Sequence, residues 1–172
     1  MADPEPFGPI IFVGAESVGI PGQRRFRLKA MRDDGHTAML WLEKEQLAAL
    51  GDAIETVLRG EGYEHIPLAA DDRPEEPVFP LHADIEFRIG QLSMGLYRED
   101  RTIIIISIPA AGEEPVSSPG ISFAIGYADA YELREEITRV IAAGRPPCPL
   151  CGGPIDPTGH ICPRRNGHHA QL

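Results

Sequence analysis

The chain has 172 residues, the length of one ordinary domain with room for a short extension. Apolar residues make up 42% of it and charged residues 24%, a globular composition that excludes collagen-like and wholly disordered classes. The net charge is −10; residues 145–172 hold three arginines and one aspartate, so the first 144 residues carry −12 and would repel a nucleic-acid backbone. No apolar run approaches the ~20 residues of a membrane span, and the acidic, proline-rich start is unlike a secretory signal, so we expect a cytoplasmic protein without membrane contact.

The first half of the chain predicts three strands followed by a helix. The first strand, Pro9–Gly19, has glycines near its end. The second strand, Gln23–Met31, alternates apolar with basic residues, as a half-buried strand does. The third is His36–Leu42, where Trp41 is expected in the core, and Lys44–Leu58 then has apolar residues at the spacing of an amphipathic helix.

After an acidic, proline-rich linker at about 67–80, the second half predicts the same order of elements. Strands are expected at His82–Met94, Thr102–Ile108 and Gly120–Ile125, and a helix at Ala130–Ala143. The isoleucine run of the middle strand suits a strand that is buried on both faces and therefore central in its sheet. Asp129, with Glu132 three residues later, predicts a capping box at the start of the helix.

Two segments share the pattern G-x-x-S-x-G, because Gly14–Ile20 aligns with Gly90–Leu96 at an offset of 76 residues. Further strand and helix positions match at an offset of 83. Two matching blocks in the same order predict an internal duplication, with repeat one at about 9–62 and repeat two at about 81–144. We therefore expect residues 1–144 to form an α+β domain of duplicated β-β-β-α units, with a mostly antiparallel sheet and two helices packed on one face.

The G-x-x-S-x-G segments allow two interpretations. Glycines inside strands usually mark bulges or close approaches of the backbone, which is the structural interpretation. In the functional one, the serine hydroxyls and glycine amides face a small anionic ligand, helped by the basic row of the second strand. The residues of this candidate ligand site are Gly14, Ser17, Gly19, Gly90, Ser93, Gly95, Arg25 and Arg27. The basic row is otherwise a solvated face, or pairs across strands with acids such as Glu86.

All three cysteines lie in the C-terminal segment 145–172, which we treat as a separate tail. Cys148 and Cys151 form a C-x-x-C pair followed by Gly152, the pattern of a zinc knuckle, in which a tight turn aims two sulfurs at one point. Cys162 supplies a third thiolate, and His160 lies two residues before it, so both side chains point to the same side of an extended arm. A tail this rich in proline and glycine buries too little apolar surface to fold alone, and a structural Zn²⁺ would supply the missing free energy.

Other uses of the cysteines remain open. A redox C-x-x-C pair would require a strand-to-helix context that the tail lacks, and disulfides are disfavoured in a reducing cytoplasm, but free thiols are a further alternative. His168 or His169 could replace His160 as the fourth ligand. Three thiolates and one histidine leave no open coordination position, so we do not expect a catalytic metal.

Residues 148–167 fit the form CPLCGxPxDPxGHxCPRxNG. On this motif the sequence resembles a mainly actinobacterial family of duplicated-repeat proteins that is classified as a domain of unknown function, and the likeness extends over nearly the whole chain. The resemblance places Cys148, Cys151, His160 and Cys162 at motif positions. It implies no activity.

No arrangement of residues in the sequence points to catalysis. We predict a non-catalytic cytoplasmic protein, a zinc-binding interaction or ligand-binding module with an unidentified protein partner. The first alternative is an enzyme or binder that acts on a phosphorylated small molecule at the G-x-x-S-x-G segments. The second is nucleic-acid contact through Arg164 and Arg165 of the tail, although two arginines make few phosphate contacts.

Overall fold

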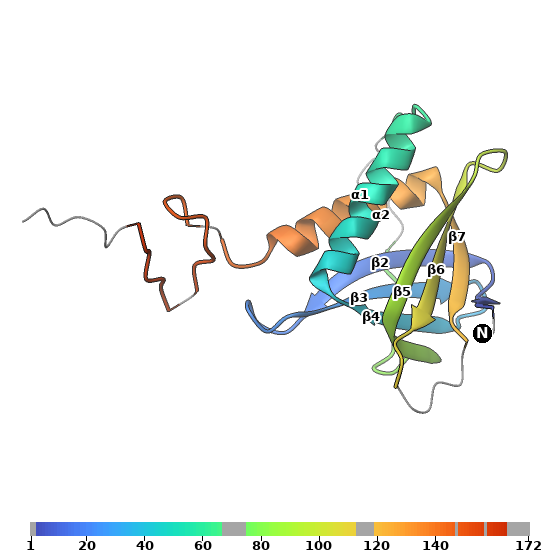
Figure 1. The fold of residues 1–172 in the computed structure, drawn as a ribbon. Coiled ribbons are helices and arrows are strands. Elements are labelled where there is room, and N and C mark those ends of the chain that lie inside the picture. The colour runs from blue at the N-terminus through green and yellow to red at the C-terminus, as the bar shows by residue number, and fades with distance from the viewer. Residues whose placement is uncertain (1–2, 67–74, 113–118, 147, 157, 165–172) are drawn as a thin grey trace, which may run out of the picture.

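The computed structural model describes residues 3–66, 75–112, 119–146, 148–156 and 158–164. Their secondary structure comprises β1 (Glu5–Pro6), β2 (Ile10–Val18), β3 (Arg25–Arg32), β4 (Thr37–Leu42), α1 (Lys44–Gly60), β5 (Ile85–Tyr97), β6 (Thr102–Pro109), β7 (Ile121–Gly126) and α2 (Tyr127–Ala142). The strands form one sheet in the order β1-β7-β6-β5-β4-β3-β2 (Figure 1). Neighbouring strands are antiparallel except for the pairs β1–β7 and β4–β5. The predicted α+β class with a mostly antiparallel sheet is confirmed; the centre of the predicted linker, 67–74, lies outside the described residues.

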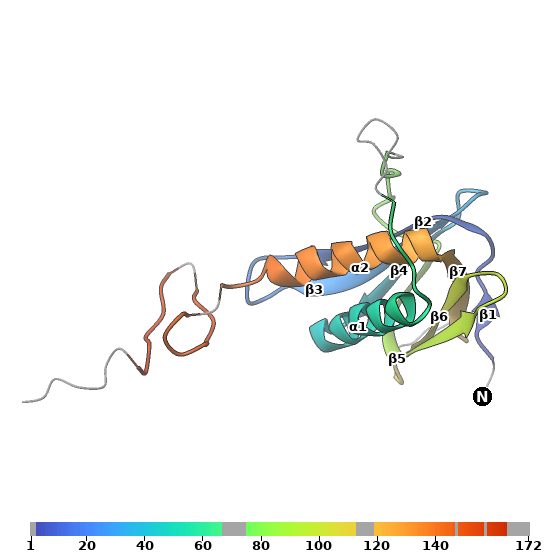
Figure 2. The same ribbon diagram turned by 90° about the horizontal axis from the view of Figure 1, so that it is seen from above.

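Both helices pack on the same face of the sheet (Figures 1 and 2). Helix α1 lies in the connection between the adjacent parallel strands β4 and β5, and such a connection has to run back over one face of the sheet. Helix α2 follows β7, packs against α1 and reaches β2 at the other side of the sheet. Alternate residues of each strand face the core: Leu28 and Leu40 are register partners on β3 and β4, and both are buried in the same hydrophobic core as Ile54 of α1.

The isoleucine strand β6 is internal to the sheet but is buried on one face only. It lies between β5 and β7, whereas β5 occupies the centre of the strand order. Ile103 and Ile105 are fully buried, and Ile104 and Ile106, which point to the other face, are half-buried. The prediction of burial on both faces is therefore wrong, because helices cover only one side of this sheet.

Helix α2 begins three residues before its predicted start. Its N-cap is Gly126, without a side-chain hydrogen bond, so the predicted capping box at Asp129 does not form. Tyr127 and Ala130 are both buried. The apolar spacing of the helix extends back to Tyr127, and burial of that side chain outweighs the local capping pattern.

Strand β1 was not predicted. Glu5 N and Phe7 N donate to Gly120 O at 3.0 Å and Ser122 O at 2.7 Å, which adds this short segment to the edge of β7. Pro6, between the two donors, has no N–H to offer on the outer side. A two-residue strand containing proline is compatible only with an edge position, and the sequence pattern alone gives no signal for it.

The face of the sheet away from the helices is polar, and Trp41 lies there instead of in the core. The guanidinium groups of Arg25 and Arg27 lie 4.3 and 5.0 Å from the centre of its indole ring. The indole N–H donates to Glu86 Oε1 at 2.8 Å. Since its neighbours Leu40 and Leu42 are buried, the period of the strand directs Trp41 outward despite its size.

Lys29 is a buried cation on this polar face. Its Nζ lies 3.0 Å from Glu16 Oε2 and 2.7 Å from Glu76 Oε1, beside the adjacent rings of Phe12 and Phe79. Burial alone would lower the pKa of Lys29, but the hydrogen bonds to Glu76 and Glu16 outweigh it and raise the pKa. Burial would likewise raise the pKa of Glu16, and hydrogen bonding, first from Lys29, lowers it instead. This network attaches the last part of the linker, with Glu76 and Phe79, to β2 and β3.

Replacing Lys29 with alanine should lower the free energy of unfolding by about 3 kcal/mol at neutral pH, because a buried ion pair loses one partner. A carboxyl whose pKa is depressed in the folded state stabilises above its ordinary value of 4.5, and this contribution is lost as pH falls through the folded pKa. The difference between wild type and Lys29→Ala should therefore shrink below pH 4.5. Urea denaturation of both proteins as a function of pH measures it.

The control is Arg59→Ala, which removes an exposed cation that pairs with Glu55 one helical turn away. Exposed pairs of this kind contribute little to stability. An equal loss in the two variants, or a difference that does not change with pH, would contradict a stabilising role for the Lys29 network.

Candidate metal centre

Four side chains of the tail converge on one point. The Sγ atoms of Cys148, Cys151 and Cys162 and a ring nitrogen of His160 all lie within 4.8 Å of one another. The two buried sulfurs, of Cys148 and Cys162, are 3.7 Å apart, and Cys151 Sγ lies 3.1 Å from His160 Nε2. These are the residues for which the sequence predicted convergence. His168 and His169, the other predicted candidates for the fourth ligand, lie outside the described residues.

Local backbone turns bring the four residues together. After the C-x-x-C pair, Gly152 N donates to Cys148 O at 2.8 Å and Cys148 N donates to Gly153 O at 2.7 Å. Gly152 has a φ of +73°, a value that residues with a Cβ rarely adopt, so glycine at this position allows the tight turn. A second turn, closed by the hydrogen bond from Gly159 N to Asp156 O at 2.9 Å, reverses the chain direction and brings His160 and Cys162 to the C-x-x-C pair.

The geometry and chemistry of the cluster fit a metal ion. Tetrahedral coordination with metal–sulfur bonds of about 2.3 Å places two sulfurs roughly 3.8 Å apart, close to the separation of Cys148 and Cys162. Gly153 packs against the donors, since a Cβ there would lie 3.4 Å from Cys151 Sγ and 3.5 Å from His160 Cε1. Gly153 was not predicted as part of the site; its place in the sequence directly after Gly152 is the signal that points to it. Cys148, Cys151, His160 and Cys162 could hold a metal ion.

The electrostatic surroundings favour the thiolate form at Cys148 but not at Cys151. Backbone N–H groups of Cys151 and Leu150 donate to Cys148 and lower the pKa of its thiol to about 6. The Gly153 N–H acts in the same direction on Cys151, but burial and the adjacent thiols of Cys148 and Cys162 outweigh it and raise that pKa. Closely spaced thiolates repel one another, and a bound cation removes this repulsion.

Contacts beyond the donors hold the tail, which follows α2 in Figure 1, together. Arg145 Nη1 pairs with Asp156 Oδ1 at 2.7 Å, and Ile155 N donates to Pro146 O at 2.8 Å. Arg164 Nη1 donates to Leu150 O at 2.9 Å. Arg164, one of the two arginines considered for nucleic-acid contact, therefore supports the C-x-x-C turn; Arg165 lies outside the described residues.

The structure does not bring the two G-x-x-S-x-G segments together. One lies on β2 and the turn after it, the other on β5, and β3 and β4 separate them. Ser17 Oγ accepts a hydrogen bond from Arg24 at 3.2 Å, whereas Gly90 and Ser93 line an apolar hollow of about 390 Å³ beside α1. Of the two basic residues assigned to the same site, Arg27 pairs with Glu16 and Arg25 lies over Trp41.

The glycines of these segments have different surroundings. Gly90 lies where the register of β5 against β6 shifts, and a Cβ there would lie 2.7 Å from Ala110 Cα. At Gly14 a Cβ would lie 2.8 Å from the ring of Phe12, and Gly19 has a φ of +106°. Gly95, by contrast, has only Ile104 Cβ nearby, at 3.9 Å. Close backbone or side-chain approach thus explains glycine at Gly90 and Gly14 without a ligand.

Comparison with known proteins adds a family but no activity. A search of curated proteins finds no match. Within the described part of the chain, neither helix combines the length and apolar character that crossing a bilayer requires. A family model described as "Protein of unknown function (DUF3090)" matches residues 6–162, a span that includes the sheet, both helices and all four donor residues of the tail. The chain belongs to the DUF3090 family.

Proposed function

We propose that the protein is a non-catalytic cytoplasmic interaction module in which a structural zinc ion shapes the C-terminal tail. The observation that carries this proposal is the convergence of Cys148, Cys151, Cys162 and His160 within 4.8 Å. Thiolate and imidazole donors favour zinc among common metal ions. Bound there, zinc would supply folding free energy to a segment that has little apolar core. Because the protein provides four donors, no position is left for a substrate.

A role in protein binding is supported by the apolar side chains around the donors. Leu150, inside the C-x-x-C turn, is 51% exposed, and Ile161, between His160 and Cys162, is 84% exposed. Metal coordination of the flanking residues would hold both side chains at the surface. Exposed apolar side chains on a small, metal-fixed loop suit contact with a protein partner.

We further infer that the two β-β-β-α units arose by duplication. Support comes from their identical order, β2–β4 with α1 and β5–β7 with α2. It also comes from the strand order, in which the second unit continues the first across the sheet. The shared G-x-x-S-x-G pattern lies on the first strand of each unit, β2 and β5.

Metal analysis tests the zinc proposal. Protein purified without chelators should contain one zinc per chain by plasma mass spectrometry. His160→Ala should weaken zinc binding by about tenfold or more in competition with a chromogenic chelator, because it removes one of the four donors that would bind the ion directly. His168→Ala is the matched control and should bind zinc as wild type does. Protein that lacks zinc and does not take it up would refute the proposed function. If His168→Ala weakened zinc binding and His160→Ala did not, His160 would be excluded as the fourth ligand.

A further inference from the structure

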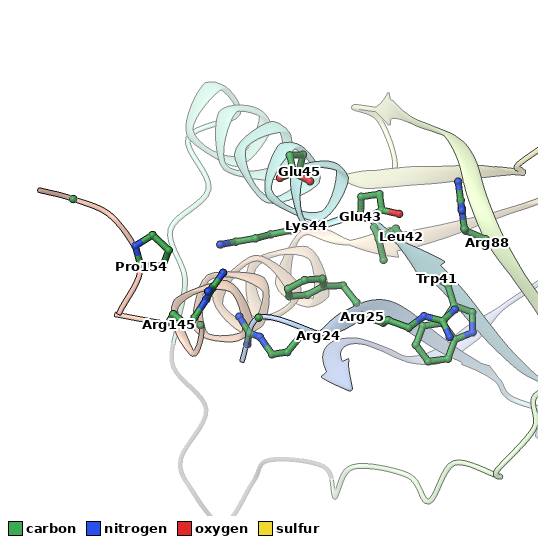
Figure 3. A pocket seen from close by; sticks show the side chains of 14 residues that line it. Arg24, Arg25, Trp41, Leu42, Glu43, Lys44, Glu45, Arg88, Arg145 and Pro154 are labelled. Atoms are coloured by element: carbon green, nitrogen blue, oxygen red, sulfur yellow. The ribbon is translucent and has the colours of Figure 1, made fainter. Parts of the chain in front are cut away.

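A cavity of about 560 Å³ lies where the start of β3, the start of α1 and the tail meet (Figure 3). Its volume falls in the range of small-molecule sites, roughly 300–1,000 Å³. Five of its lining residues are basic and two, Glu43 and Glu45, are acidic. The basic residues are Arg24, Arg25, Lys44, Arg88 and Arg145. This concentration of positive charge stands out in a protein of net charge −10.

Arg145 pairs with Asp156 of the tail, and three of the other basic residues have no ion-pair partner within the described part of the chain. Among the ion pairs of the described residues, none uses Arg24, Arg25 or Lys44. Glu43 is the N-cap of α1, and its side chain already accepts a hydrogen bond from the backbone of that helix. Cations gathered without carboxylate partners repel one another, and an anion between them relieves that repulsion.

The basic residues form two groups at different parts of the cavity wall. In the first group, Arg24 lies against Gly144 and donates to Val140 O at 3.0 Å, and the guanidinium of Arg145 lies near Gly22. Figure 3 shows the Lys44 side chain extending toward this group. In the second group, Arg25 lies over Trp41, which is the register partner of Arg88 on the adjacent strand.

The amino end of α1 also borders the cavity. Glu43, Lys44 and Glu45, around the first turn of this 17-residue helix, all line it. The first backbone N–H groups of a helix carry partial positive charge, but the carboxylates of Glu43 and Glu45 already lie beside them. The basic side chains, and not the helix end, therefore define the site.

We propose that this cavity binds a small organic ligand that carries two or more phosphate groups. Two separated groups of cations match two charged groups on one molecule, and arginine is well suited to phosphate because it offers paired donors. The indole ring of Trp41 is covered by Arg25 and Arg27, so stacking with an aromatic ligand is not part of the proposal. Arg24, Arg25, Lys44 and Arg88 belong to the body of the protein; Arg145, Gly152 and Pro154 belong to the tail that the proposed zinc site shapes.

The test compares fructose 1,6-bisphosphate, fructose 6-phosphate and fructose, which share one sugar and differ in phosphate number. Binding to the full zinc-loaded chain is followed by calorimetry and by the fluorescence of Trp41, the single tryptophan. We expect the bisphosphate to bind at least about tenfold more tightly than the monophosphate, and fructose not to bind. Because Arg25 lies on the indole ring, bisphosphate binding should also change the fluorescence.

Two variants and a control test whether the bisphosphate binds in this cavity. Arg25→Gln and Lys44→Gln alter exposed side chains and should each weaken bisphosphate binding by about tenfold, with unchanged melting temperature. Arg59→Gln removes the same charge from an exposed position that does not line the cavity and should leave binding unchanged. Equal affinities for the three sugars, no binding of the bisphosphate at millimolar concentration, or equal loss in all three variants would overturn the proposal. Zinc content is measured on the same samples, so failure of the zinc site and failure of the anion site are distinguished.

Discussion

Replacing Cys148 with serine is expected to abolish stoichiometric zinc binding and to unfold the tail while the sheet and helices stay intact. Cys148 is buried, its sulfur lies 3.7 Å from that of Cys162, and backbone N–H groups lower the pKa of its thiol, so its loss removes a donor that is prepared to bind as a thiolate. Zinc should fall from one to below roughly 0.1 per chain. Limited digestion with subtilisin should then cut within residues 145–164, and the melting of the remaining domain should stay cooperative.

Leu150→Ser is the matched control, because it places the same new side chain in the same turn at a half-exposed position that offers no metal donor. It should retain zinc and resist digestion. If Cys148→Ser and Cys162→Ser both kept one zinc per chain, the assignment of the four donors would be wrong. If Cys148→Ser also lowered the melting temperature of the domain strongly, the tail would be part of the core and not a separate unit.

Replacing Gly90 with alanine should lower the free energy of unfolding by about 2–3 kcal/mol. A Cβ at this position would lie 2.7 Å from Ala110 Cα and 3.0 Å from Pro109 O, both backbone atoms that cannot move without distorting the β5–β6 pairing. Gly95→Ala, in the same segment, meets nothing closer than 3.9 Å and should change stability little. Chemical denaturation of the two variants measures the difference.

The pair of variants also separates the two interpretations of the G-x-x-S-x-G pattern. If glycine is required only where the backbone is close, Gly90→Ala is destabilising and Gly95→Ala behaves as wild type in every assay. An equal stability of the two variants would contradict the bulge at Gly90. A loss of phosphate-ester binding in Gly95→Ala without loss of stability would instead support a ligand at this segment.

The parts of the fold that depend on local periodicity could be predicted from the sequence. Phe26, Leu28 and Ala30 are buried on one face of β3, as their alternation indicates, and α1 begins at Lys44 as expected. The convergence of Cys148, Cys151, His160 and Cys162 was also predictable, because all four donors lie within 15 residues and two turns suffice to assemble them.

Features that depend on tertiary context could not be predicted. The start of α2 depends on the burial of Tyr127, and the outward position of Trp41 depends on which face of the sheet the helices cover. The basic cavity was missed for a similar reason. Its lining comes from segments as distant in sequence as Arg24, Lys44, Arg88 and Arg145, and no spacing rule relates positions that only the sheet order brings together.

The short strand β1 has a consequence for how the protein behaves at high concentration. An uncovered strand edge is a template onto which a second chain can add, the first step toward fibres or sheet-to-sheet adhesion. Here β1 lies along the outer edge of β7. The N–H groups of Glu5 and Phe7 are hydrogen-bonded to Gly120 and Ser122, and Pro6 between them has no N–H to donate to a second chain. The acidic, proline-rich segment that contains β1 thus hinders the pairing of two copies of the protein at this edge of the sheet.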